Sequence, residues 1–126
     1  MIRSNMSENI ASVPEPPPVT RGEVVTTHLI AEMSRIRDLA PFDKIARQVN
    51  ALIVLVTERN AFGLAKYGQP LMTEDGRNGI EDARQELGDL LQYVCKCAMT
   101  RRDDDELREF LDLTSTALFI MRQLIK

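Results

Sequence analysis

The segment NGIEDARQELGDLLQYVCKCAMTR, residues 78–101, carries two stripes of side chains at helical spacing. The first stripe is apolar and repeats every three or four residues, which places its members on one face of an α-helix. It consists of Ile80, Ala83, Leu87, Leu90, Val94 and Cys97. The second stripe is polar and consists of Asp82, Glu86, Asp89 and Tyr93. The segment therefore predicts a helix that buries one face in a core and presents an acidic face beside it.

The acidic face is a candidate site for a divalent cation. Like charges at helical neighbour spacing repel by roughly 0.2–0.5 kcal/mol per pair, so three carboxylates kept together suggest a cation between them. Glu86 and Asp89 form an ExxD pair on one side of the helix, and Gly88 between them allows another group to approach closely. Asp82 lies one turn earlier and Tyr93 one turn later. Because Mg²⁺ and Mn²⁺ prefer oxygen ligands, these carboxylates are candidate ligands for either ion.

Three further helices are expected around this segment, and no pattern typical of a β-strand competes with them. Apolar residues recur at helical steps over residues 22–39 and 42–66, with a break at Pro41. A last helix is expected over residues 104–125, which begins with acidic side chains. The stretch Ala51–Val56 is apolar throughout, which indicates that more than one face of its helix is buried. We therefore predict an all-α four-helix bundle that associates with other copies of itself.

The 126 residues are enough for one domain with a modest core. Residues 1–20 are polar and end in a proline-rich run, PEPPP, so a flexible Pro-rich tail is predicted there. Residues 21–126 form the predicted domain. Within it, residues 67–77 read YGQPLMTEDGR and predict a loop, because glycines and a proline interrupt the helical period.

Composition argues against several classes of function. The net charge of −3 disfavours direct nucleic-acid binding, which needs clustered Lys and Arg. No apolar run approaches the roughly 18 residues of a membrane span, and the first residues lack the apolar core of a signal peptide. We therefore expect a cytoplasmic protein without a membrane partner. His28 is the only histidine, which disfavours zinc binding and histidine-based catalysis.

A further carboxylate and several cations could extend the acidic face into a larger site. Glu58 follows the apolar tract of the second helix, and it could face the stripe if the second and third helices are antiparallel neighbours. Lys66 and Arg77 flank the loop, where they offer a point charge and a planar fork for phosphate. Lys96 lies one turn after Tyr93 and could also reach a phosphate. The alternative for each charge is a solvated side chain on a helix surface.

Residues 58–94 read ERNAFGLAKYGQPLMTEDGRNGIEDARQELGDLLQYV. This block resembles the all-α nucleoside triphosphate pyrophosphatases, the MazG-like superfamily, which also includes dimeric dUTPases and dCTP pyrophosphatases. Its last ten residues, QELGDLLQYV, are similar to the second metal-binding helix of that superfamily. The block looks most like the short phage-encoded branch, whose members share a KYGxPL, then a GR, then a DAxQE with an Asp three residues later.

The resemblance implies Mg²⁺-dependent hydrolysis of a nucleoside triphosphate to the monophosphate and pyrophosphate, with Mn²⁺ as a possible substitute. It also implies a four-helix fold whose site is completed in a homodimer or homotetramer. By motif, Glu86 and Asp89 match the ExxD metal ligands, and Tyr93 matches a tyrosine that touches the nucleotide. Glu58 matches the last acid of a first-helix EExxE motif whose other two acids are absent here. We expect Asp82 to substitute as a metal ligand.

The same resemblance suggests roles for the remaining candidates. Glu58 or Glu86 would orient the attacking water as the general base. Lys66 and Arg77 would stabilise the departing pyrophosphate. Asn60 and the loop would line the base pocket. Phage relatives suggest a deoxypurine triphosphate, dGTP or dATP, as the substrate, and its removal would reshape the nucleotide pool.

Two alternatives remain open from the sequence. One is the same chemistry on a pyrimidine nucleotide, dUTP or dCTP. The other is a non-catalytic helical adaptor that binds another protein through its tail and apolar helices, which the incomplete EExxE motif favours.

Overall fold

The computed structural model describes residues 21–100 and 104–126, and this part of the chain is all-α. Four helices follow one another, and their bounds are α1 Val25–Leu39, α2 Asp43–Tyr67, α3 Gly79–Thr100 and α4 Asp105–Leu124. The only β-type pairing among the described residues is an isolated antiparallel bridge between Val24 and Met72. The predicted all-α class is therefore confirmed, whereas the predicted tail over residues 1–20 lies outside the described residues.

The helix ends have the local chemistry that the sequence indicates. The carboxamide of Asn78 accepts a hydrogen bond from the Glu81 backbone N–H at 3.1 Å, which caps the start of α3. Asp104 does the same for the Glu106 N–H at 2.7 Å at the start of α4. At the end of α2, Gly68 adopts the left-handed conformation, with φ of 74°, that favours glycine. Asn78 and Asp104 therefore mark the starts of α3 and α4, and Gly68 marks the end of α2.

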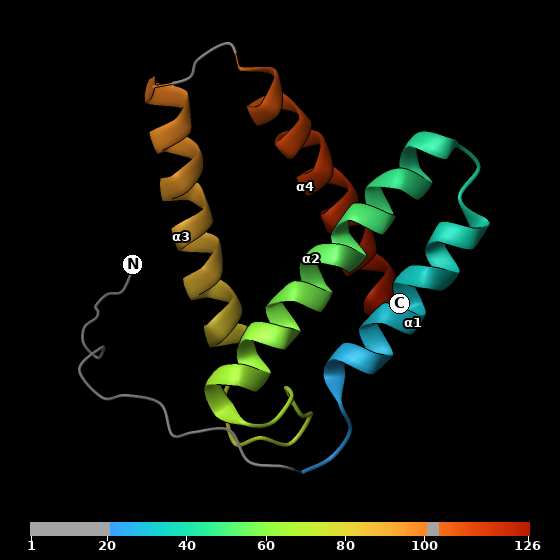
Figure 1. Ribbon diagram of the computed structural model, residues 1–126, viewed down its shortest axis with the longest axis vertical. Coiled ribbons are helices and arrows are strands. Elements are labelled where there is room, and N and C mark those ends of the chain that lie inside the picture. The colour runs from blue at the N-terminus through green and yellow to red at the C-terminus, as the bar shows by residue number, and fades with distance from the viewer. Residues whose placement is uncertain (1–20, 101–103) are drawn as a thin grey trace.

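The core lies among α1, α2 and α4. Its buried side chains are Met33, Ile36, Val49 and Ile120, and Val49 is completely buried. Figure 1 shows α1 and α2 running side by side as an antiparallel hairpin, with α4 crossing α2. Apolar burial of this kind is the main source of stability for a small helical domain.

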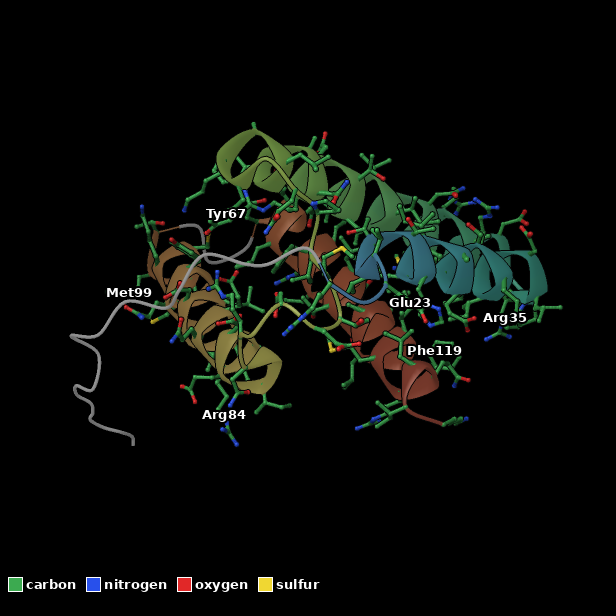
Figure 2. All side chains as sticks on the ribbon, turned by 90° about the horizontal axis from the view of Figure 1, so that it is seen from below. Glu23, Arg35, Tyr67, Arg84, Met99 and Phe119 are labelled. Carbon is green, nitrogen blue, oxygen red and sulfur yellow. The ribbon has the colours of Figure 1, made fainter. Side chains whose placement is uncertain are left out.

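Helix α3 stands apart from this core. No Cα atom of α3 comes within 8 Å of α1 or α2, and its only helix contact is with α4. None of its residues is buried, and Leu91 and Tyr93 are each 65 % exposed. Figure 2 shows Arg84 and Met99 on α3 pointing away from the other helices. Within the described residues, α3 thus adds little to the core of one chain, and the association with further copies that the sequence predicts stays a prediction.

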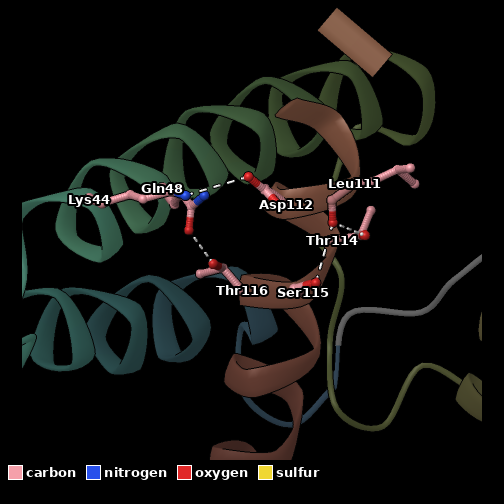
Figure 3. Close-up of polar contacts among 7 residues, drawn as sticks. All are labelled: Lys44, Gln48, Leu111, Asp112, Thr114, Ser115 and Thr116. Atoms are coloured by element: carbon pink, nitrogen blue, oxygen red, sulfur yellow. Dashed lines mark hydrogen bonds and ion pairs between the residues drawn. The ribbon is translucent and has the colours of Figure 1, made fainter. Parts of the chain in front are cut away.

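Polar contacts fasten α4 to α2 (Figure 3). The buried Thr116 hydroxyl donates a hydrogen bond to the Gln48 side-chain carbonyl. Nearby, Lys44 Nζ lies 3.5 Å from Asp112 Oδ2 in an exposed ion pair. An exposed pair of this type contributes little, so the register of the two helices depends mainly on the buried hydrogen bond and the apolar core.

The loop after α2 folds back onto the start of α1. The Val25 N–H donates to the Leu71 carbonyl at 2.9 Å, and the Thr73 N–H donates to the Glu23 carbonyl at 2.9 Å. Gly22 has a φ of 83°, and a Cβ atom there would lie 2.1 Å from Thr73 Oγ1. A glycine is therefore needed for this close approach. The pairing places the loop beside the hairpin of α1 and α2.

No helix within the described residues is long and apolar enough to cross a membrane.

Replacing Ile120 by alanine is expected to lower the free energy of unfolding by about 2–5 kcal/mol, because the truncation leaves a cavity where α4 meets the core. Urea denaturation measures this change. The matched control is Ile125→Ala, because Ile125 is 85 % exposed and its truncation should change stability by less than about 0.5 kcal/mol. Similar effects of the two substitutions would contradict the position of α4.

Candidate functional site

A cavity of about 570 Å³ lies between the α1–α2 hairpin, the loop after α2 and the first turns of α3. Its volume is in the range of pockets that hold small molecules and cofactors. One part of the wall is apolar and comes mainly from Val25, Leu29, Leu55 and Val56. The other part is polar and includes Asn60, Asp75, Arg77, Asp82, Gln85 and Glu86. The cavity thus combines an apolar side with a charged side, as a nucleotide requires.

The charged side is organised around Arg77. Its Nε lies 3.5 Å from Asp82 Oδ2, and both side chains are largely shielded from water. The guanidinium of Arg77 also lies against the Tyr67 phenol, which lies at the end of α2. A cation held in a partly dry wall attracts an anion more strongly than an exposed cation does. Arg77 is therefore a partly buried cation in the wall of the cavity.

Tyr67 lies between two cations. Hydrogen bonding to Arg77, and then to Lys66, holds the pKa of the Tyr67 phenol below its usual value, because both cations favour the phenolate. The ammonium of Lys66 also lies 5.2 Å from the centre of the Tyr67 ring, within the range of a cation–π contact. The end of α2 therefore places positive charge beside Tyr67, which lines the cavity.

Asn60 is held in place by α1. The Thr26 hydroxyl donates a hydrogen bond to Asn60 Oδ1 at 3.2 Å, across 34 residues of sequence. Both residues line the cavity. Because Thr26 engages the carbonyl oxygen of Asn60, the NH₂ group is the part of this side chain that is a candidate donor to a ligand.

The structure brings together some of the predicted site residues and separates the others. Four of them line the cavity, namely Asn60, Arg77, Asp82 and Glu86. The remaining five are exposed side chains that do not line it, namely Glu58, Lys66, Asp89, Tyr93 and Lys96. Lys66 contacts the neighbouring Tyr67, whereas Asp89, Tyr93 and Lys96 lie on the exposed part of α3.

The predicted set of four carboxylate ligands, Glu58, Asp82, Glu86 and Asp89, does not converge in one chain. Among the described residues, no three His, Cys, Asp or Glu side chains lie close enough to hold a metal ion. The reason is that Glu58 is on α2, which does not pack against α3, and that Asp82 is paired with Arg77. Glu86 and Asp89 remain as an i, i+3 pair on α3. Such a donor set suits Mg²⁺ that also has water and phosphate ligands, because this ion needs only one or two carboxylates from protein.

Thr26, Tyr67 and Asp75 also line the cavity, although none of them is among the predicted site residues. Thr26 carries no local signal, because its partner Asn60 is remote in sequence. Tyr67 lies within the KYGxPL block, but its position between two cations follows only from the fold. Asp75 belongs to an Asp-Gly pair that predicts a turn, and a turn residue is ordinarily exposed, whereas this one is buried.

No protein-family model, curated protein or solved structure matches this chain. The likeness to the MazG-like superfamily therefore rests on the motifs in residues 58–94 alone.

The Tyr67 phenol is expected to titrate below the usual pKa of about 10, because Arg77 and Lys66 stabilise its anion. The chain has two tyrosines, so Tyr93→Phe leaves Tyr67 as the only phenol, and its ionisation can be followed by ultraviolet absorbance. Adding Arg77→Gln should move the midpoint upward. A midpoint that is unchanged by Arg77→Gln would show that the two side chains do not touch.

Proposed function

We propose that this protein hydrolyses a nucleoside triphosphate to the monophosphate and pyrophosphate with the help of Mg²⁺ or Mn²⁺. The proposed substrate is a purine deoxynucleotide, dGTP or dATP. The observation that carries the proposal is a cavity of nucleotide size with Arg77, Asp82 and Glu86 on its charged side and apolar residues on the other. The motifs shared with the MazG-like superfamily support the same reaction.

Each of these side chains would have its own role in the reaction. Arg77 binds the phosphates and stabilises the charge that develops on the departing pyrophosphate. Glu86 lies in the wall, where it can accept the proton of the attacking water as the general base. Glu86 and Asp89 would hold the metal ion, which neutralises the triphosphate and lowers the pKa of a bound water. Asn60 would contact the base from α2.

We infer that a second copy of the chain completes this site. A single chain leaves the apolar side chains Val54 and Leu55 of α2, and Leu87 and Leu91 of α3, largely in water. An exposed apolar surface of this kind is typical of an interface between proteins. Association into a homodimer or homotetramer would remove this area from water and bring further carboxylates, such as Glu58, to the acidic face of α3.

The adaptor remains as the second candidate function. The exposed apolar surface of α3 favours it, and so does the lack of a preformed metal cluster among the described residues. A panel of ribo- and deoxynucleoside triphosphates distinguishes the candidates by pyrophosphate release with Mg²⁺, with Mn²⁺ and with EDTA. Release from dGTP or dATP supports the proposal, and release from dUTP or dCTP alone supports the pyrimidine alternative. No release by the folded protein supports the adaptor.

The double substitution Glu86→Gln, Asp89→Asn should reduce pyrophosphate release at least about 100-fold, because it removes two candidate ligands and one candidate base. The far-ultraviolet circular dichroism spectrum should stay the same, since both side chains are exposed on α3. The matched control on the same helix is Glu81→Gln, which does not line the cavity and should retain activity. Full activity of the double variant would show that the site is elsewhere.

The protein should elute from gel filtration as a dimer or tetramer, with a light-scattering mass that is twice or four times the 14.3 kDa of one chain. Leu91→Lys should shift it toward the monomer, because a charge in an apolar interface is costly to desolvate. Gln92→Lys adds the same charge at the next position of α3 and serves as the control. A monomeric wild-type protein would contradict the shared site.

A further inference from the structure

Asp75 is a buried carboxylate in the wall of the cavity that the proposed reaction does not use. Only 6 % of the residue is exposed, although it belongs to a surface loop, and it lines the cavity. A carboxylate is costly to bury unless hydrogen-bond donors or cations compensate for the lost water. The position of Asp75 therefore requires an explanation in terms of its partners.

The loop itself supplies one donor. The backbone N–H of Arg77 donates to Asp75 Oδ1 at 3.0 Å, and no other hydrogen bond or ion pair is made by the Asp75 side chain within the described residues. An ionised carboxylate can accept about four hydrogen bonds. Asp75 thus retains most of its acceptor capacity at a position that lines the cavity.

The loop that carries Asp75 is fixed rather than loose. Its backbone pairs with the segment that precedes α1: the Thr73 N–H donates to the Glu23 carbonyl at 2.9 Å, and the Glu74 N–H donates to the Arg21 carbonyl at 3.2 Å. The Glu23 N–H returns a hydrogen bond to the Thr73 hydroxyl at 2.9 Å. A hydrogen-bonding group on a rigid support can select between ligands, because it does not move away to suit the wrong one.

We propose that Asp75 reads the nucleobase and selects guanine. This inference rests on the proposed function, because it assumes that the cavity binds a nucleotide. Guanine presents two adjacent donors, N1–H and the 2-amino group, which a carboxylate accepts together. Its O6 is an acceptor, which matches the NH₂ group of Asn60 that Thr26 leaves available.

The other purines fit this pair of groups less well. Adenine has an unprotonated N1, whose lone pair would face the carboxylate, and hypoxanthine lacks the 2-amino donor. Xanthine carries a carbonyl oxygen at position 2, which a carboxylate repels and an amide can bind. A site that is built to bond a donor group rejects an analogue that lacks it strongly, because its buried acceptor is then left unpaired. Asp75 would therefore favour dGTP over dATP.

The test is Asp75→Asn with nucleoside monophosphates, which report base binding without any hydrolysis. Isothermal titration calorimetry gives affinities for the monophosphates of guanine, hypoxanthine, adenine and xanthine with one and the same sugar. Asparagine keeps the oxygen that accepts from the Arg77 N–H, so the loop should be retained. Glu74→Gln removes the same charge from the neighbouring exposed residue and serves as the matched control.

The wild-type protein should bind the guanine nucleotide at least about tenfold more tightly than the hypoxanthine or adenine nucleotide. Asp75→Asn should weaken guanine binding by about 10- to 100-fold and strengthen xanthine binding, because its NH₂ group can donate to the 2-oxygen. If Asp75 had only a structural role, its replacement would not weaken guanine binding and strengthen xanthine binding at the same time. Glu74→Gln should leave all four affinities unchanged.

The outcomes separate this inference from the proposed function. Equal binding of the four bases, no binding of any of them, or an unchanged preference in Asp75→Asn would overturn the role of Asp75, even if the protein releases pyrophosphate from dGTP. Binding of guanine that depends on Asp75, together with no pyrophosphate release from any nucleotide, would support the role of Asp75 and refute the proposed hydrolysis.

Discussion

The backbone pairing between the start of α1 and the loop after α2 is the interaction on which the cavity depends. It links Glu23 to Thr73 and Val25 to Leu71, each at 2.9 Å. Without it, the loop that carries Asp75 and Arg77 would have no fixed relation to the helices that supply the apolar wall. Gly22 is part of this constraint, because any side chain there would collide with Thr73.

A second constraint is the small core. Three helices, α1, α2 and α4, contribute its buried residues, which are Met33, Ile36, Val49 and Ile120. Each of these helices buries the apolar face that it turns toward the other two. The apolar stripe of α3 and the outer face of α2 are left without a partner in one chain. The same surface carries the acidic residues. A second copy of the chain that covered the apolar stripe would therefore also change the surroundings of the carboxylates beside it.

Local structure could be predicted from the sequence, whereas the position of α3 could not. Helical spacing and the cap residue Asn78 define α3 closely, because both depend only on nearby residues. An apolar stripe indicates that a face is covered without indicating by what, so the stripe predicts burial of Leu87, whereas this side chain is 57 % exposed in one chain. The place of Glu58 could not be predicted for the same reason, because it would face the acidic stripe only if α2 and α3 were neighbours, and they do not pack together in one chain. Contacts such as Thr26 with Asn60 depend on the tertiary fold and leave no local pattern.

The hydrogen bond between Glu23 and Thr73 closes a loop of 50 residues, which has a consequence for the order of folding. Closing so long a chain segment is entropically unfavourable when the segment is unstructured. Once the α1–α2 hairpin has formed, its two antiparallel helices already bring the ends of the segment together. The pairing that fixes the loop is therefore expected to follow the hairpin in folding, and it requires the chain as far as Thr73. A ligand that binds in the cavity recognises only chains in which the loop has already docked against the hairpin.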